Sequence, residues 1–200
     1  MTKRAFDAAL ASIGLALSAP LWLVLASAIK LEDRGPVFYA QDRVGKGGRI
    51  FRALKFRSMR QDAEAATGPL QARHADARIT RVGRVMRATA MDELPQLWNI
   101  VRGDMSFVGP RALRPGEIEF EGGAPVPLEA VPGYVQRITV SPGLTGVAQV
   151  YAARDVPRRH KFRYDALYIR RRSLWLDVRL ILLSFWISFR GTWESRGRKY

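Results

Sequence analysis

The most pronounced pattern in the chain is an uncharged run near its N-terminus. No Asp, Glu, Lys or Arg occurs from Ala8 to Ile29, a stretch of 22 residues. A helix rises about 1.5 Å per residue, so a helix of this length reaches across the roughly 30 Å hydrocarbon layer of a bilayer. Three structures are compatible with the run: a signal peptide, a helix that spans the membrane, and a re-entrant helix that enters one leaflet and returns.

Features within and beside this run bear on the choice. The basic start and the sequence Ala26-Ser27-Ala28 imitate a signal peptide, but the apolar part is unusually long for one. Pro20 falls near the middle, where it removes one helical hydrogen bond and favours a kink, and Ser18 offers a hydroxyl for a freed carbonyl. Basic residues flank both ends, so the charge asymmetry that orients spanning helices is weak. These residues are Lys3, Arg4, Lys30 and Arg34.

A β-hairpin is predicted after Gly35-Pro36. Its strands are Val37–Gln41 and Arg49–Leu54, and the cluster Gly45-Lys46-Gly47-Gly48 separates them. This cluster lacks the spacing and the Lys-Ser/Thr pair of a phosphate-binding P-loop, so we interpret it as a turn.

The middle of the chain alternates between polar segments and short apolar runs. Residues 61–77 are polar and contain Gly68-Pro69, which indicates a surface segment. Arg then recurs every third residue from Arg78 to Arg87, a spacing typical of a solvated helical face.

The C-terminal third is predicted to be mainly helical. Residues 116–132 indicate a loop with a short helix at 117–120, and residues 161–169 indicate an amphipathic helix. The last helix begins at Ser173, and its apolar part is too short to span a membrane, which leaves an interfacial helix or a buried core helix. The predicted fold class is therefore α+β, mostly helical, with a small β-hairpin.

Two adjacent carboxylates, Asp92 and Glu93, precede a further predicted helix. Its apolar residues recur at the spacing of one helical face: Leu94, Leu97 or Trp98, and Val101. Pro95 suits the first turn, which places Asp92 at or near the N-cap. Asp92 could cap the helix, or it could act as a nucleophile toward phosphorus, since a helix N-terminus attracts phosphate. A turn-rich run through Gly109-Pro110 is expected to return Arg111 toward this pair.

The net charge limits the classes of binding partner but does not decide among them. The net charge of +15 implies a polyanion: a nucleic acid, an anionic phospholipid surface or a phosphorylated substrate. The chain contains no Cys, which excludes a disulfide framework and a thiolate metal site. His74 and His160 are isolated, so an all-His zinc site is not supported either. The length of 200 residues suits one domain.

Three blocks of sequence carry a resemblance to a known family. Residues Asp92–Asn99, continued by Arg102–Arg111, closely resemble the signature of the bacterial sugar transferases, the monotopic phosphoglycosyl transferases. Lys55–Met59 upstream and Pro142–Gln149 downstream resemble two further blocks in the same order. Arg87 occupies a position where the family carries an arginine. The resemblance covers nearly the whole chain and suggests the minimal form of the family, without the extra N-terminal transmembrane domain of larger members.

The resemblance implies an activity and a set of residues for it. The reaction would transfer a sugar-1-phosphate from a UDP-sugar to a polyprenol (undecaprenyl) phosphate and release UMP, as the first membrane step of a glycan pathway. Asp92 would be the nucleophile that forms a covalent phosphosugar intermediate, with Glu93 as its partner. Mg²⁺, bound partly by Asp92 and partly by the diphosphate, would neutralise charge. The substrate-binding residues so implied are Lys55, Arg87, Arg111 and, from a shifted position, Arg154. The residues themselves suggest two further candidates: Arg57, a cation beside Lys55, and Thr145, whose hydroxyl could face a phosphate in an anion nest at residues 141–146.

The resemblance also implies a topology. Residues 1–34 would form the re-entrant membrane helix and residues 35–200 a catalytic unit, on the cytoplasmic face of the bacterial inner membrane. The sugar, the glycan pathway and the oligomeric state are not indicated by the sequence.

The chain departs from the family pattern at three places. The family commonly has Ser-Pro at the bend, whereas this chain has Ala19-Pro20 with Ser18 one position earlier. Ser141 stands where the family often has Arg before Pro-Gly, and Tyr151–Arg154 replaces an Asn-Gly-Arg block. Arg154 could take over that role from a shifted position.

Two functions of other classes remain open on the sequence. A membrane-tethered nucleic-acid binder would explain the basic charge, but the chain has no recognisable reading helix or stacking motif, so we expect no nucleic-acid partner. A non-catalytic scaffold of a glycan-synthesis machine would keep the membrane segment and ignore UDP-sugars.

Overall fold

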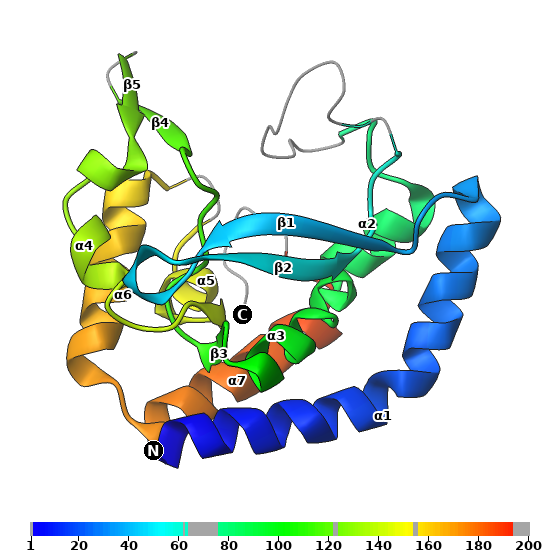
Figure 1. The fold of residues 1–200 in the computed structure, drawn as a ribbon, viewed down its shortest axis with the longest axis horizontal. Coiled ribbons are helices and arrows are strands. Elements are labelled where there is room, and N and C mark those ends of the chain that lie inside the picture. The colour runs from blue at the N-terminus through cyan, green and yellow to red at the C-terminus, as the bar shows by residue number, and fades with distance from the viewer. Residues whose placement is uncertain (1, 62, 64–75, 122–123, 154–155, 194–200) are drawn as a thin grey trace.

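The computed structural model describes residues 2–61, 63, 76–121, 124–153 and 156–193. Helix is the main secondary structure, and the strands form small two-stranded sheets, as Figure 1 shows. The helices are α1 (Thr2–Asp33), α2 (Arg81–Ala88), α3 (Gln96–Arg102), α4 (Tyr134–Arg137), α5 (Val147–Tyr151), α6 (Arg158–Arg171) and α7 (Leu174–Phe189). The 3₁₀ turns are η1 (Lys46–Gly48), η2 (Met91–Glu93) and η3 (Leu128–Ala130). The strands are β1 (Phe38–Val44), β2 (Ile50–Phe56), β3 (Ser106–Val108), β4 (Ile118–Glu121), β5 (Ala124–Pro127) and β6 (Gly143–Thr145).

Strands β1 and β2 form the predicted hairpin. They pair antiparallel, from Phe38 opposite Phe56 to Val44 opposite Ile50. Gly47 and Gly48 have φ angles of 67° and 80°, left-handed values that glycine adopts readily. The interpretation of the glycine cluster as a turn is therefore confirmed.

Two further sheets were not predicted. Strands β3 and β6 pair in parallel, although the sequence predicts no strand in either segment. The helix predicted at residues 117–120 is wrong, because Ile118 begins strand β4, which pairs antiparallel with β5. Pairing with a segment farther along the chain overrides the local preference there.

The pairing of β3 with β6 depends on two glycines. A Cβ atom on Gly143 would lie 2.1 Å from the backbone nitrogen of Gly109, and one on Gly109 would lie 2.4 Å from the Ser141 carbonyl oxygen. Both contacts are far inside van der Waals distance, so any larger residue would push the two segments apart. This close approach fixes the start of the loop that carries Arg111.

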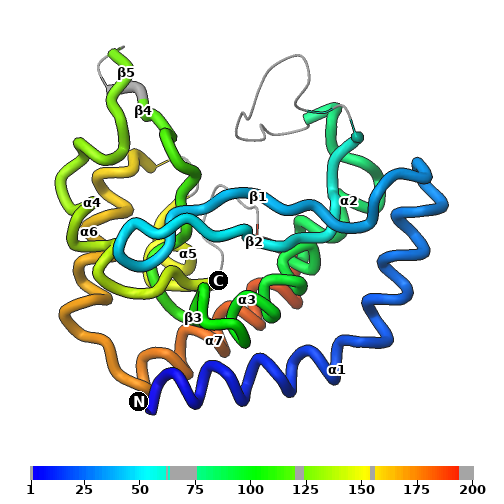
Figure 2. Tube along the Cα trace, viewed as in Figure 1, coloured from blue at the N-terminus to red at the C-terminus, as the bar shows by residue number. Residues whose placement is uncertain are grey.

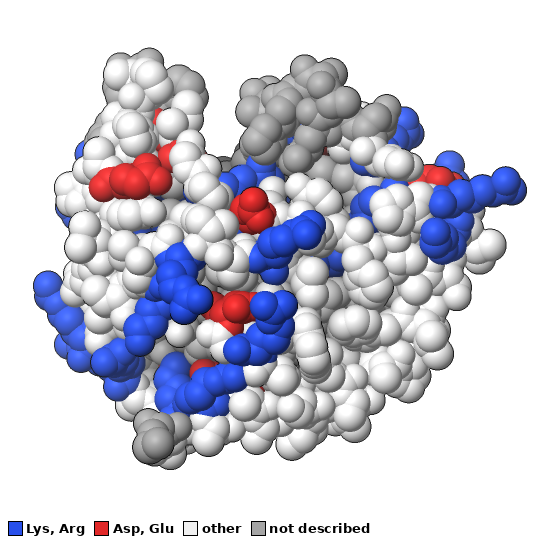
Figure 3. Space-filling view, in the orientation of Figure 1, with Lys and Arg blue, Asp and Glu red and all other residues white. Residues whose placement is uncertain are grey.

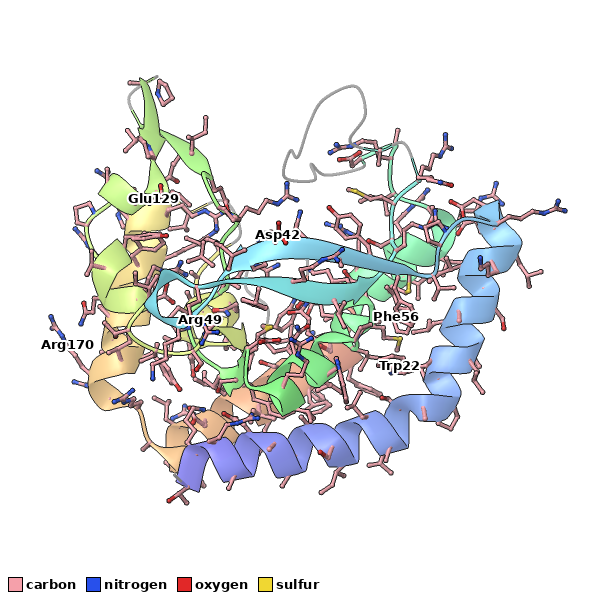
Figure 4. The ribbon with its side chains drawn as sticks, viewed as in Figure 1. Trp22, Asp42, Arg49, Phe56, Glu129 and Arg170 are labelled. Atoms are coloured by element: carbon pink, nitrogen blue, oxygen red, sulfur yellow. The ribbon has the colours of Figure 1, made fainter. Side chains whose placement is uncertain are left out.

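Helix α1 is long, apolar and bent. Figures 1 and 2 show that α1 is bent near its middle, and Figure 4 shows Trp22 near the bend, just after Pro20, where the missing helical hydrogen bond predicts it. The hydroxyl of Ser18 donates to the Leu15 carbonyl (3.3 Å) and accepts from the Trp22 indole nitrogen (3.0 Å). The Trp22 ring then packs edge-on against Phe56 of the hairpin, with 5.2 Å between centroids.

The N-terminal end of α1 is held by buried polar contacts. The Lys3 ammonium lies 2.7 Å from an oxygen of Asp177 in α7. The Ser106 hydroxyl donates to the buried carboxylate of Asp7 (2.8 Å), and the Tyr168 hydroxyl donates to Asp177 (2.8 Å). These bonds tie α1 to α6, α7 and β3.

The C-terminal end of α1 is held by the same globular unit. The guanidinium of Arg57, which follows β2, forms a two-armed ion pair with Asp33 and donates to the Pro36 carbonyl. Glu32 accepts hydrogen bonds from the first backbone N–H groups of α2, at 2.6 and 3.0 Å. Both ends of a 32-residue apolar helix are therefore anchored to one unit.

Large apolar side chains remain exposed on α1 and α7. By length and composition, α1 is the one helix in the described part of the chain that could cross a membrane. Exposed residues on α1 include Ile13, Leu17, Leu23, Val24 and Leu31, and those on α7 include Trp175, Leu182, Phe185, Trp186 and Phe189. Exposed apolar surface on this scale is unusual for a protein surrounded by water and typical of one that contacts lipid.

Candidate active site

The two adjacent carboxylates lie on the short turn η2, between α2 and α3. The following helix begins at Gln96, with Pro95 at its N-cap position, and not at Asp92. Asp92 thus does not cap α3, and the capping interpretation is wrong. Ala90, directly before η2, has φ 57° and ψ 17°, a left-handed conformation that costs an L-residue about 1 kcal/mol. A strained backbone therefore leads into the carboxylate pair.

Glu93 is buried between two cations. Its Oε1 atom lies 2.5 Å from Lys55 Nζ and 3.4 Å from Arg111 Nη2, and the residue is 6% exposed. Burial raises the pKa of Glu93, but the charges of Lys55 and Arg111 and the Lys55 hydrogen bond outweigh it and hold the pKa at about 2. Glu93 is therefore ionised throughout the physiological range, and the predicted return of Arg111 to the acid pair is confirmed.

Lys55 is positioned by a side chain of α3. The amide of Asn99 accepts from the Leu54 backbone N–H (3.0 Å) and donates to the Arg52 carbonyl (2.8 Å). Asn99 thereby completes the free edge of β2 as a neighbouring strand would. The next residue along β2 is Lys55, so its direction toward Glu93 is fixed by the docking of α3.

Arg111 is positioned from its backbone. The segment pairs with Gly143 in an isolated parallel bridge, and the Gly143 N–H donates to the Pro110 carbonyl (2.9 Å). The Arg137 guanidinium donates to the Arg111 carbonyl (2.7 Å) and to Asp165 (3.1 Å). The side chain of Arg111 is 42% exposed and remains accessible to a ligand.

These groups line a small pocket that is partly open to solvent. Its walls come from the hairpin, η2, the start of α3, and the segments around β3 and β6. The lining residues are Arg43, Ala53, Lys55, Glu93, Gln96, Met105, Arg111, Ala112, Gly143 and Leu144. Cationic, amide and carboxylate groups on a partly apolar wall suit a small anionic ligand.

Two lining residues were missed by sequence reasoning. Arg43, on β1, donates to the Ala112 carbonyl (2.9 Å) and to Gln41. Burial and the nearby charges of Arg111 and Arg114 lower the pKa of Arg43 to about 10, so it stays cationic. Gln96 lies at the start of α3. Its position in the resembling block was the available signal, whereas nothing local marks Arg43.

The other predicted binding residues lie in different surroundings. Arg57 pairs with Asp33, so we assign it to the anchoring of α1 and not to substrate. The hydroxyl of Thr145 is 2.5 Å from that of Ser184 in α7, and the residue is buried. Arg87 is half-buried in the last turn of α2, the helix that precedes η2. Arg154 lies outside the described residues.

Asp92 is buried, at 6% exposed, beside Glu93. The residues that the structure describes include no group of three or more His, Asp and Glu side chains that would hold a metal alone. Mg²⁺ is commonly bound by one or two carboxylates together with substrate phosphates. Asp92 is therefore a suitable donor for such an ion, while Glu93 already faces two cations.

The fold and the site define a chain with a long apolar helix at its periphery and a small pocket in which two cations hold Glu93, the neighbour of the buried Asp92. The chain belongs to the bacterial sugar transferase family, whose model matches residues 1–191. It is 45% identical over 183 residues to the UDP-N-acetylgalactosamine-undecaprenyl-phosphate N-acetylgalactosaminephosphotransferase of Aeromonas hydrophila, with 90% of this chain and 41% of that protein covered.

Two other relatives are covered more fully. Identity is 41% over 189 residues to the UDP-glucose:undecaprenyl-phosphate glucose-1-phosphate transferase of Caulobacter vibrioides, covering 91% of this chain and 67% of that protein. It is also 41% over 188 residues to the exopolysaccharide production protein PSS of Rhizobium leguminosarum bv. phaseoli, covering 90% of each. The chain thus spans less than half of the Aeromonas relative and most of the Rhizobium relative.

Removing the Glu93 charge is expected to change how stability depends on pH. A lowered pKa means that ionised Glu93 stabilises the fold above the unfolded pKa of 4.5, and that this contribution is lost as pH falls toward 2. Glu93→Gln should cost about 3 kcal/mol of unfolding free energy at pH 6, and much less at pH 3. Denaturant unfolding in detergent at each pH measures the difference.

The matched control is Glu129→Gln, which changes an exposed carboxylate in η3 (Figure 4). Its difference from the wild type should stay near zero throughout. A Glu93→Gln difference that is equal at pH 6 and pH 3 would contradict the paired, low-pKa state of Glu93.

Proposed function

We propose that this chain transfers a sugar-1-phosphate from a UDP-sugar to a polyprenol phosphate, undecaprenyl phosphate in bacteria, and releases UMP. The observation that carries the proposal is the pocket in which Lys55 and Arg111 converge on Glu93, next to Asp92. Family membership and the names of the relatives supply the donor and acceptor classes. Such a product begins the synthesis of an exopolysaccharide or another envelope glycan.

In the proposed first step, a carboxylate oxygen of Asp92 attacks the β-phosphorus of the UDP-sugar. A bond forms between that oxygen and phosphorus while the bridging P–O bond breaks, and UMP leaves with the electron pair. In the second step, an oxygen of the polyprenol phosphate attacks the same phosphorus and frees the Asp92 carboxylate. The product is a polyprenyl diphosphosugar, so one diphosphate bond replaces another.

The neighbouring side chains have distinct roles in this proposal. Lys55 and Arg111 stabilise the charge of the non-bridging phosphoryl oxygens as the bond to UMP breaks, and Arg87 would do so from α2. Glu93 keeps both pocket cations in place through its ion pairs. Mg²⁺ bound partly by Asp92 would add positive charge at the leaving phosphate.

The contacts of α1 support a re-entrant topology. Lys3 and Asp7 near its start, and Glu32 and Asp33 at its end, all bond to one globular unit. A straight spanning helix would place its two ends about 30 Å apart across the hydrocarbon layer, on opposite faces of the membrane. A bend at Pro20 lets both ends remain at one face while the exposed apolar residues enter a leaflet.

The charge distribution suits an anionic membrane surface and anionic substrates. Figure 3 shows Lys and Arg side chains spread over the face that carries the hairpin, with a few Asp and Glu side chains among them. The net charge is +15. Because nucleotide sugars are cytoplasmic, we place the catalytic unit on the cytoplasmic face of the inner membrane, against anionic phospholipid.

The activity is tested by UMP release from a panel of UDP-sugars, with undecaprenyl phosphate and Mg²⁺ in detergent. We expect release with at least one sugar and its loss when the metal is chelated. Asp92→Asn should lower the rate at least about a thousandfold, because the amide is a poor nucleophile.

Asp42→Asn, at an exposed position on β1, is the matched control and should keep the wild-type rate. Full turnover by Asp92→Asn would show that the nucleophile is another group. Failure to release UMP from any UDP-sugar would favour a scaffold or a nucleic-acid binder.

The topology is tested by single cysteines, since the natural chain has none. Thr2→Cys and Lys46→Cys are at exposed positions, one before the apolar run and one in the hairpin turn. With a membrane-impermeant maleimide, both should react from the same side of oriented vesicles. Reaction from opposite sides would establish a spanning helix and overturn the re-entrant proposal.

A further inference from the structure

Gln96 lines the pocket but has no role in the two-step transfer as proposed. It is the first residue of α3, is 5% exposed, and lines the pocket together with Lys55, Glu93 and Arg111. A phosphoryl group held by Lys55 and Arg111, as proposed, would therefore lie in the pocket that Gln96 lines.

The side-chain amide of Gln96 is not satisfied by the fold. Within the residues that the structure describes, its Nε2 atom is buried and has no hydrogen-bond partner. Leaving a buried donor unpaired costs about 1–3 kcal/mol, so native folds keep such groups rarely. A polar ligand that enters the pocket would supply the missing acceptor.

Asn99 provides the contrast one turn further along the same helix. Its amide bonds to both Leu54 and Arg52 of β2, so both its donor and its acceptor are used. The unpaired donor of Gln96 is thus specific to the position that faces the pocket. The Asn99 amide therefore joins α3 to β2, whereas the Gln96 donor is available to a ligand.

The charge of the pocket indicates which ligand group this is. Lys55 and Arg111, which line the pocket with Gln96, are the cations that the proposed reaction directs at the transferred phosphoryl group. The cations on the pocket wall favour phosphoryl oxygens, which are strong hydrogen-bond acceptors.

We infer that the Gln96 amide donates a hydrogen bond to a phosphoryl oxygen of the transferred sugar phosphate. The inference rests on the proposed transfer reaction and makes Gln96 a binding residue for it. The transferred phosphoryl group is present in the donor, in the covalent intermediate and in the product. The bond from Gln96 therefore acts in both half-reactions, unlike a contact to the uridine, which acts only in the first.

Gln96→Met tests this with a side chain of similar length and no donor. Formation of the intermediate is measured as the burst of UMP without acceptor, and its consumption as decay after undecaprenyl phosphate is added. We expect both rates to fall about tenfold to hundredfold. The loss should be equal for the two fastest UDP-sugars, because the phosphoryl group is common to them.

The unfolding midpoint is a second measurement, because a structural role for the Gln96 amide predicts the opposite change in it. Removing an unpaired donor should leave the unfolding midpoint unchanged or raise it, whereas Asn99→Leu, which breaks paired bonds, should lower it. A lower midpoint for Gln96→Met would show that the amide is bonded within the fold, and would overturn the inference.

Two other outcomes would overturn the phosphoryl contact. A slower UMP burst with an unchanged decay rate would assign the Gln96 bond to the nucleotide. A loss of rate that differs between the two UDP-sugars would assign the bond to a hydroxyl of the sugar. Wild-type rates in Gln96→Met would overturn the inference while the transfer reaction stands. A wild-type chain that releases no UMP would instead overturn the proposed function.

Discussion

A buried carboxylate that must be paired determines how the pocket is built. Glu93 lies in the interior, where an unpaired charge is costly, and its partners Lys55 and Arg111 are 38 and 18 residues away in sequence. Satisfying Glu93 therefore brings the hairpin, the turn η2 and the loop after β3 to one point. The surrounding features keep these segments in place: Asn99 on the edge of β2, and the close approach of Gly109 to Gly143.

The pairing of charged side chains also explains the position of the long helix α1. Its uncharged middle favours lipid, yet both of its ends carry charged side chains whose partners lie on the globular unit, such as Asp7 with Ser106 and Asp33 with Arg57. Pro20 removes the hydrogen bond that would keep the helix straight, and Trp22 packs against Phe56 at the bend. A soluble donor and a lipid-borne acceptor would meet at the surface that this arrangement creates.

Local sequence was sufficient to predict those elements that one strong signal determines. The glycine cluster at residues 45–48 predicted the hairpin turn, and the uncharged run with Pro20 predicted the kinked helix. Features that depend on a partner elsewhere in the chain could not be predicted from local sequence. Strand β4 forms because it pairs with β5, and Arg57 anchors α1 because it pairs with Asp33. The start of α3 was placed one turn early because Asp92 suits an N-cap. The pocket residue Arg43 could be recognised only once the segments were packed together, because no local signal marks it.

The central claim is that the carboxylate of Asp92 forms a bond to the transferred phosphosugar. Incubation with a UDP-sugar and Mg²⁺ without lipid acceptor, followed by tryptic digestion and fragmentation mass spectrometry, tests it directly. The account predicts the mass of one sugar phosphate on the peptide 88–102, assigned to Asp92 and lost when undecaprenyl phosphate is added. UMP release in the presence of acceptor without any such adduct, or an adduct on Glu93 or another residue, would contradict it.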